Sequence, residues 1–531
     1  MSQYDNEIRR RRTFAIISHP DAGKTTLTEK FLLYGGAINE AGSVKGRKTS
    51  KHAVSDWMEI EKQRGISVTS SVLQFEYEGY CINILDTPGH QDFSEDTYRT
   101  LMAADSAVMV IDGSRGVQAQ TIKLFKVCVM RHIPIFTFIN KLDRDTRDPF
   151  ELMDEIENVL GIRTCPVNWP IGSGKNFKGV YDRGTRKITT FTAADAGMHE
   201  IASQELDVVG SEDKIGIIQY QKLTEDIELL DGAAEEFDQK RVDEGQLTPV
   251  FFGSALTNFG VQTFLEHFLK MTLSPLPRNS SEGPISPFDD RFSAFVFKIQ
   301  ANMNKNHRDR IAFMRIVSGK YEAGMEVNHV RENRVIRLAQ STEMMADERR
   351  IVREAYAGDI IGVFDPGIFQ IGDTICNPKE HIAFEGIPTF APEHFARVRQ
   401  ADTMKRKQFV KGITQIALEG AIQVFHECNT GMEEIIVGVV GELQFDVLRF
   451  RLKNEYNVEI ALEILPYEYI RWVENWQTFN VDDINGTTDM KIVVDKHGRP
   501  LLLFENEWSP NMVLERNKGL VLSEFGTAIM E

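Results

Sequence analysis

The chain has 531 residues, enough for about three to five domains, because a domain usually contains roughly 100 to 200 residues. Hydrophobic residues make up 42% and charged residues 26% of the chain, which is ordinary for a folded globular protein. The net charge of −17 excludes the strongly positive field that drives indiscriminate nucleic-acid binding, so any RNA contact must be local and DNA is not an expected partner.

The cysteines and the hydrophobic runs indicate a reducing, aqueous compartment. The 5 cysteines are scattered and show no C-x-x-C spacing, which predicts free thiols and argues against a disulfide framework or a zinc site. The N-terminus lacks the apolar stretch of a signal peptide, and no apolar run approaches the roughly 18 residues of a membrane span. We therefore expect a cytoplasmic protein that does not contact a membrane.

Two basic clusters are candidates for local contact with RNA or phosphate. One is the run from Arg9 to Arg12. A charge run is as often a solvated surface face as a binding site, so both interpretations stay open for each cluster. The other cluster consists of Lys405, Arg406, Lys407 and Lys411.

The first chemical motif is "SHPDAGKTT", residues 18–26, between an apolar run and a stretch with Leu27, Phe31 and Leu32 at helical spacing. A strand, a loop and a helix in this order form a phosphate-binding loop, in which backbone amides and the helix dipole surround the nucleotide phosphates. Lys24 would add a point charge and Thr25 a Mg²⁺ ligand. We assign the following residues to this site: Ser18, His19, Pro20, Asp21, Ala22, Gly23, Lys24, Thr25 and Thr26.

Ser18 stands where the usual G-x-x-x-x-G-K-[ST] pattern has glycine. The first position shapes the turn out of the strand, whereas the donor amides are expected from about Asp21 to Thr25. Pro20, which has no N–H group, therefore removes no required donor. We predict that the φ angle of Ser18 is negative.

The second motif, "DTPGH" at residues 86–90, follows another apolar run. We expect Asp86 to hold Mg²⁺ through water, the Gly89 amide to meet the γ-phosphate, and His90 to face the attacking water. Phosphoryl transfer needs mainly positioning and charge stabilisation, which such residues supply. Lys24, Gly89 and His90 are the predicted catalytic residues, and Thr87 and Pro88 complete the motif.

The third motif is "NKLD", Asn140, Lys141, Leu142 and Asp143, again at the end of an apolar run. The Asp143 carboxylate can accept two hydrogen bonds from the N1 and N2 edge of guanine, a pair that adenine cannot supply. Asn140 and Lys141 would support the base and the loop. The weaker motif "GSAL" at 253–256 offers the Ser254 hydroxyl and the Ala255 amide to guanine O6, with Leu256 beside them.

A fourth motif, "RGIS", comprises Arg64, Gly65, Ile66 and Ser67 in a long polar stretch before Asp86. Such a loop can close over the γ-phosphate, with Ser67 as a second Mg²⁺ ligand. Arg64 is either a charge stabiliser or a solvated side chain. The four motifs in this order predict a Mg²⁺-dependent GTPase switch in which GTP orders residues 39–67 and 86–95 and thereby rotates the later domains.

The organisation along the chain predicts several domains. Residues 1–280 should form an α/β P-loop GTPase domain with a parallel sheet covered on both faces and a long insertion at about 144–253. Residues 273–292 form a Pro-, Ser- and Gly-rich linker, and the short alternating runs of 293–388 predict a β-barrel. Residues 389–531 show the strand-helix-strand-strand-helix-strand order of a ferredoxin-like α+β domain, with an extension after Ile464 that contains a hairpin.

These features resemble the translational GTPases over nearly the whole chain, through "DAGKTT", "RGIS", "DTPGH" and "NKLD" followed by a barrel and a ferredoxin-like domain. The insertion is similar to that of the translocation elongation factor and of the bacterial release factor 3 family. The short C-terminal extension and the wording "SDWMEIEKQRGISV" and "GVVGELQFDVL" resemble the latter.

This resemblance implies a ribosome-dependent GTPase that promotes dissociation and recycling of class I peptide release factors. The chain contains no Gly-Gly-Gln tripeptide, so it is not expected to hydrolyse peptidyl-tRNA itself. The implied cofactors are GTP or GDP and Mg²⁺. The implied partners are the ribosomal RNA and proteins near the factor-binding site and, through the ribosome, the class I factors; the protein itself is expected to be a monomer.

Three other interpretations stay open. One is another ribosomal GTPase, of the translocase or antibiotic-protection type. A second is a metabolic regulatory GTPase, such as the subunit of a sulfate-activating enzyme, although that type usually lacks the long insertion. A third is a P-loop kinase or ATPase in which "NKLD" is a coincidence, and a comparison of GTP with ATP binding would distinguish it.

Overall fold

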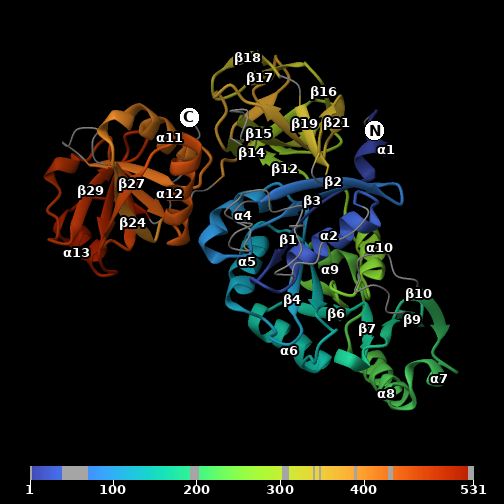
Figure 1. Cartoon of the computed structure of the whole chain (residues 1–531). Helices are drawn as coiled ribbons and strands as arrows, with labels where there is room; N and C mark the ends of the chain where they lie inside the picture. The colour runs from blue at the N-terminus through green and yellow to red at the C-terminus, as the bar shows by residue number, and fades with distance from the viewer. Residues whose placement is uncertain are drawn as a thin grey trace.

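The computed structural model describes residues 3–38, 70–191, 203–301, 310–338, 341–345, 348–387, 391–427 and 435–523. An N-terminal α/β domain is followed by a β-barrel and then by an α+β domain, and Figure 1 shows each as a separate body in contact with its neighbours. The predicted fold class is confirmed. None of the helices within these ranges is long and apolar enough to cross a membrane.

The N-terminal domain is built on a seven-stranded sheet in the order β2-β3-β1-β4-β5-β11-β6. All neighbouring pairs are parallel except β2 with β3, so the predicted parallel sheet carries one antiparallel edge strand that the sequence did not indicate. The strands are β1 (Arg11–Ser18), β2 (Ser71–Tyr77), β3 (Tyr80–Asp86), β4 (Ser106–Asp112), β5 (Ile135–Asn140), β6 (Arg163–Pro166) and β11 (Leu247–Phe252).

Helices cover both faces of this sheet and create two cores. On one face, Phe31 of α2 (Lys24–Tyr34) packs with Phe264 and Phe268 of α10 (Val261–Met271). The other core receives apolar side chains from α4 (Ser94–Leu101), α5 (Ala119–Met130) and α6 (Pro149–Leu160). Because β4 and β5 are buried along their whole length, their sequences are the continuous apolar runs expected of central parallel strands.

The segment 144–253 contributes to two sheets. It supplies the strands β6 and β11 to the main sheet and the helix α6 that packs on it. The remainder forms a four-stranded antiparallel sheet, β10-β9-β8-β7, with α8 beside it (Figure 1). The Asn168 side chain joins the two sheets, donating to the Phe252 carbonyl at 3.1 Å and accepting from the Phe252 amide at 2.7 Å. The added elements are β7 (Asn168–Ile171), β8 (Gly179–Asp182), β9 (Lys187–Phe191), β10 (Ser203–Asp207), α7 (Glu212–Ile215), α8 (Ile217–Ala233) and α9 (Gln239–Asp243).

The barrel consists of an eight-stranded sheet in the order β18-β17-β23-β14-β15-β22-β19-β20 and the short pair β16 with β21. The preceding linker contains a small hairpin, β12 (Arg278–Ser280) with β13 (Gly283–Ile285), which the sequence did not indicate. The barrel strands are β14 (Ser293–Ala301), β15 (Arg310–Ser318), β16 (Lys320–Glu322), β17 (Glu326–His329), β18 (Arg334–Arg337), β19 (Ser341–Met345), β20 (Glu348–Val352), β21 (Glu354–Tyr356), β22 (Ile360–Phe364) and β23 (Thr374–Cys376).

The C-terminal domain has the predicted ferredoxin-like order, with strands paired as β27-β24-β26-β25. Its extension does not form a separate body, because β29 pairs with β25 and continues the same sheet through β30, β28 and β31. The elements are β24 (His394–Gln400), α11 (Arg406–Leu418), β25 (Gln423–Glu427), β26 (Ile435–Val439), α12 (Leu443–Tyr456), β27 (Ile460–Leu465), β28 (Tyr469–Val473), β29 (Met490–Val494), β30 (Pro500–Phe504), α13 (Ser509–Arg516) and β31 (Leu522–Ser523).

The basic cluster from Arg9 to Arg12 lies at the contact between the N-terminal domain and the barrel. Arg11 Nε donates to Asp359 Oδ2 of the barrel at 2.7 Å, and both side chains are buried. Burial lowers the pKa of Arg11, but the charge of Asp359 and the hydrogen bonds to Asp359 and Glu7 together raise it above its usual value. Arg9 and Arg12 stack on the rings of Phe288 and Tyr80. This cluster is therefore structural rather than a free RNA-binding surface.

The second basic cluster lies on the surface of the C-terminal domain. Lys407 and Lys411, in the first half of α11, are exposed, so an RNA contact stays open for that cluster.

The cysteines within the described ranges are buried free thiols, as predicted: Cys81, Cys128, Cys165 and Cys376. Burial raises the pKa of the Cys128 thiol to about 12, which makes it unreactive.

We predict that Asp359→Asn weakens the contact between the N-terminal domain and the barrel. Removing the Asp359 charge leaves the buried Arg11 guanidinium with Glu7, which is 39% exposed, as its carboxylate partner, so the loss should approach but not exceed the cost of a broken buried pair, about 3–5 kcal/mol. Chemical denaturation should show a lower midpoint for the first transition. Asp231→Asn is the matched control, because its partner Arg186 is 64% exposed and a surface pair is worth about 1 kcal/mol or less. Equal midpoints for both variants would contradict the assignment.

Candidate nucleotide-binding site

The sequence motifs meet at one edge of the main sheet. Parallel pairing places Asp86 opposite Ile16, near the end of β1, and Asn140 opposite Asp112. In an open α/β sheet this carboxyl edge is where ligands bind. The predicted residues lie as follows: Ser18 ends β1, His19–Gly23 form the loop, Lys24–Thr26 begin α2, Asp86 ends β3, Thr87–His90 follow it, Asn140 ends β5, Lys141–Asp143 follow it, and Ser254–Leu256 follow β11.

The backbone of the loop 18–26 has the shape that its sequence requires. Among the described residues, Asp21 and Gly23 have positive φ angles of 64° and 98°, and Ser18 does not, as predicted. A Cβ atom on Gly23 would lie 2.2 Å from the Nδ2 atom of Asn140. Glycine is thus required here both by backbone conformation and by space.

A buried ion pair links the first two motifs. Lys24 Nζ donates to Asp86 Oδ1, and the two side chains are 6% and 1% exposed. The second carboxylate oxygen, Asp86 Oδ2, is buried and has no hydrogen-bond partner among the described residues. An orphaned buried carboxylate oxygen calls for a proton donor or a cation, so a water bound to Mg²⁺ suits this position.

Asn140 joins three loops. Its Nδ2 atom donates to the Ala22 carbonyl at 2.9 Å, and its Oδ1 atom accepts from the amides of Lys141 and Ala255, both at 2.8 Å. The Ala255 amide, which was predicted to bind guanine O6, therefore donates to Asn140 and holds the loop after β11 in place. Its contact with a base stays a prediction, and it would require this hydrogen bond to be shared or released.

The Asp143 carboxylate is held in one orientation at the mouth of this site. Its Oδ1 atom accepts from the buried Ser254 hydroxyl at 2.6 Å, and its side chain is 15% exposed. Leu142 is buried and donates its amide to the Gly253 carbonyl at 3.2 Å, whereas Leu256 is 44% exposed. The carboxylate is thus fixed by its neighbours and partly accessible to solvent.

Asp112 also lies at this site, although it is part of none of the predicted motifs. Lys141 Nζ donates to Asp112 Oδ2 at 2.7 Å, and Ser114 binds the other carboxylate oxygen. Burial raises the pKa of Asp112, but these hydrogen bonds lower it by more. Its position at the end of an apolar strand, as for Asp86 and Asn140, was the available signal.

The loop after β3 lies against the phosphate loop. A Cβ atom on Gly89 would be 3.5 Å from the Cα atom of Pro20, and the Thr87 hydroxyl donates to the Ile16 carbonyl at 2.7 Å. His90 Nδ1 lies 3.0 Å from Asp92 Oδ1. Burial lowers the pKa of the His19 imidazole in the neighbouring loop. The fourth motif, Arg64, Gly65, Ile66 and Ser67, lies outside the described residues.

Models of three known domain families match the chain in consecutive segments. Residues 9–274 match the Elongation factor Tu GTP binding domain, residues 291–378 match Elongation factor G domain 2, and residues 384–514 match the Class II release factor RF3, C-terminal domain. The order of these matches corresponds to the α/β domain, the barrel and the α+β domain of the structure.

Known proteins resemble the chain over its full length. Peptide chain release factor 3 of Symbiobacterium thermophilum is 60% identical over 98% of each chain. Its counterparts in Gloeobacter violaceus and Listeria monocytogenes are 54% and 52% identical, over 98% of this chain and 98% and 99% of their own. A crystal structure of a Thermus thermophilus protein superimposes with a TM-score of 0.69 at 22% identity, covering 88% of this chain and 70% of that one, which supports the fold.

We predict that Gly23→Ala lowers affinity for GDP by at least about tenfold, because its Cβ would displace Asn140 and strain the loop. Fluorescent-nucleotide titration measures this. Gly36→Ala is the matched control, since Gly36 has a φ of 66° but open space around its Cβ position. The control should cost about 1 kcal/mol of stability without changing nucleotide affinity. Equal affinities for Gly23→Ala and Gly36→Ala would show that the contact with Asn140 does not shape the site.

Proposed function

The chain belongs to the peptide chain release factor 3 family and is a GTPase of translation termination, and we propose that it dissociates class I release factors from the ribosome after peptide release. The observation that carries this proposal is the identity of 60% over 98% of both chains, together with the match of residues 384–514 to a release-factor domain. Ribosome partnership follows from the family. The class I factors as indirect partners, a monomeric state and a cytoplasmic location are parts of the proposal.

In the proposed nucleotide site, Asp143 selects guanine through the N1 and N2 edge, and the loop from Ser18 to Thr26 surrounds the phosphates. Support comes from the fixed, partly exposed Asp143 carboxylate and from the start of α2 at Lys24. Guanine selectivity distinguishes this function from that of a P-loop kinase or ATPase. The remaining base contacts are assigned to Asn140, Lys141, Leu142, Ser254, Ala255 and Leu256.

Mg²⁺ is the proposed metal, held by the Thr25 and Ser67 hydroxyls and, through water, by Asp86. The unpaired buried oxygen Asp86 Oδ2 supports this assignment. When bound, the cation neutralises charge on the β- and γ-phosphates. Lys24, now paired with the other oxygen of Asp86, lies within reach of the same phosphate region and adds a fixed positive charge.

For hydrolysis we assign the Gly89 amide to the γ-phosphate and His90 to the attacking water. The close approach of Gly89 to Pro20 supports the first assignment, because it brings the loop after β3 to the phosphate loop. The partly exposed His90 side chain, 30% accessible, supports the second. Residues 64–67 would close over the γ-phosphate, and Arg64 in that loop would be either a charge stabiliser or a solvated side chain.

The proposed activity predicts that purified protein hydrolyses GTP slowly and that ribosomes accelerate it. The decisive measurement uses a post-termination ribosome that carries a fluorescently labelled class I release factor. Addition of this protein with GTP should speed the departure of the label, whereas GDP alone should not. Unchanged turnover with ribosomes, or unchanged departure of the label, would reject the proposal.

Asp143→Asn should reduce GTP affinity by about a hundredfold or more, because a carboxylate acceptor is replaced by an amide at the N1 and N2 edge of guanine. Xanthosine triphosphate carries a carbonyl where guanine carries its amino group, so it should bind the variant and restore departure of the labelled factor. Asp154→Asn, an exposed residue of α6, is the matched control. Retained GTP preference in Asp143→Asn would place base recognition elsewhere.

A further inference from the structure

We propose that Asp92 is a positioning residue for His90, and that docking of the C-terminal domain holds Asp92 in place. The inference rests on the proposed role of His90 toward the attacking water. Asp92 lies in η1 (Gln91–Phe93), the short turn between the loop after β3 and α4, and is 7% exposed. Through Asp92, the C-terminal domain contacts the segment that follows His90.

The two carboxylate oxygens of Asp92 bind groups from different domains. Oδ1 lies 3.0 Å from Nδ1 of His90, and Oδ2 accepts from the backbone amide of Leu443 at 2.8 Å. Leu443 is the first residue of α12, so its amide has no acceptor within the helix and is free for this contact. One side chain therefore connects His90 directly to the start of a helix in the C-terminal domain.

Two groups of Asp92 contact the same nitrogen of His90. The backbone amide of Asp92 donates to Nδ1 at 3.3 Å, which requires Nδ1 to be the acceptor. The carboxylate lies 3.0 Å from Nδ1 and can accept from it only when Nδ1 carries a proton. In either state Asp92 holds the ring through Nδ1 and thereby sets the direction in which Nε2 points.

The C-terminal domain is shaped around this carboxylate. A Cβ atom on Gly441 would lie 2.2 Å from Asp92 Cγ, so only glycine leaves room for it. Gln444 Oε1 accepts from the amides of Val440 and Gly441, at 2.8 and 3.1 Å, and thereby fixes the turn before α12. The position of Asp92 therefore depends on whether this turn is docked.

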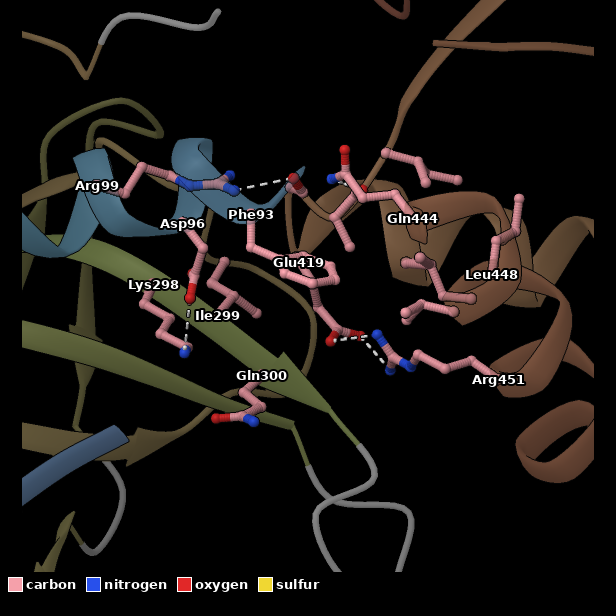
Figure 2. Close-up of a pocket in the computed structure, with 15 residues that line it drawn as sticks. Phe93, Asp96, Arg99, Lys298, Ile299, Gln300, Glu419, Gln444, Leu448 and Arg451 are labelled. Atoms are coloured by element: carbon pink, nitrogen blue, oxygen red, sulfur yellow. Dashed lines mark hydrogen bonds and ion pairs between the residues drawn. The ribbon is translucent and has the colours of Figure 1, made fainter. Parts of the chain in front are cut away.

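The rest of the junction includes an apolar contact, a hydrogen bond to a backbone carbonyl and a cavity. Phe93 packs on Val447, and Arg99 of α4 donates to the Gly420 carbonyl at 2.9 Å. Figure 2 shows Arg99 reaching toward the C-terminal domain beside Lys298 of the barrel. The cavity among the three domains has a volume of about 50 Å³, room for a few waters, and within the described part of the chain the Nε2 atom of Gln300 on its wall has no hydrogen-bond partner.

The test begins with Asp92→Asn, which keeps the shape of the side chain but offers only one acceptor oxygen. Either Leu443 or His90 must then face an NH₂ donor. Single-turnover GTP hydrolysis on ribosomes should fall by at least about tenfold. Affinity for GDP and GTP should stay the same, because Asp92 does not contact the nucleotide. Unchanged nucleotide affinity also shows that the variant is folded.

The same measurement in a His90→Ala background separates positioning from a general structural effect. If Asp92 acts through His90, Asp92→Asn causes no further decrease once His90 is absent. An equal decrease in both backgrounds overturns the inference, as does a wild-type rate for Asp92→Asn. A wild-type rate for His90→Ala alone would instead overturn the proposed role of His90, so the two failures are distinguishable.

Gly441→Ala tests the same contact with a substitution in the C-terminal domain. Its φ angle is not in the left-handed region, so alanine adds no backbone strain, and its Cβ displaces the carboxylate. We expect a slower single-turnover rate with His90 present and no change in the His90→Ala background. Glu442→Ala, an exposed neighbour, is the matched control and should keep the wild-type rate. A wild-type rate for Gly441→Ala would contradict the proposed link between docking and His90.

Discussion

The hydrogen bonds of Asn140 are the constraint on which the nucleotide site depends. One buried amide group binds the Ala22 carbonyl and the amides of Lys141 and Ala255, so the loops after β1, β5 and β11 are fixed relative to one another. The same group occupies the space beside Gly23 that a Cβ would need. The proposed phosphate-binding and base-recognition loops are consequently coupled through Asn140, and its buried polar atoms make any loosening of these loops costly.

The two domain contacts of the N-terminal domain differ in kind. The barrel is held by buried charges: Arg11 with Asp359, and Arg315 with Asp105 at 2.5 Å, which together resist separation because each pair loses a buried partner. The C-terminal domain is held by hydrogen bonds to backbone groups and an apolar contact, beside a cavity of about 50 Å³. Hydrogen bonds of the second kind can be exchanged for bonds to water, which suits the proposed link between docking and His90.

Much of the fold follows from the sequence because the chemistry lies at strand ends. The apolar runs before Asp86 and Asn140 predicted central parallel strands, and parallel pairing necessarily brings their carboxyl ends together. The edge strand β2 pairs with β3, and the two strands of the linker hairpin pair with each other, across short turns, so their signals were local ones that apolar runs alone did not reveal. The merging of β28–β31 with the ferredoxin-like sheet was not predictable, because it depends on pairing between β25 and β29, which lie far apart in the chain. Arg11 and Asp92 were missed as contact residues for the same reason: their partners lie hundreds of residues away.

Helix α4 contacts Ser70, the barrel and the C-terminal domain. Asp96 on this helix accepts from the amide and the hydroxyl of Ser70, at 2.6 and 2.5 Å, and Ser70 follows the segment that contains the fourth motif. Lys298 of the barrel also pairs with Asp96, at 3.4 Å. Arg99 on the same helix binds the C-terminal domain, and Asp92 directly precedes it beside His90. Helix α4 thus joins Ser70 to the barrel through Asp96 and to the C-terminal domain through Arg99, and a rigid shift of this short helix would change both contacts at once.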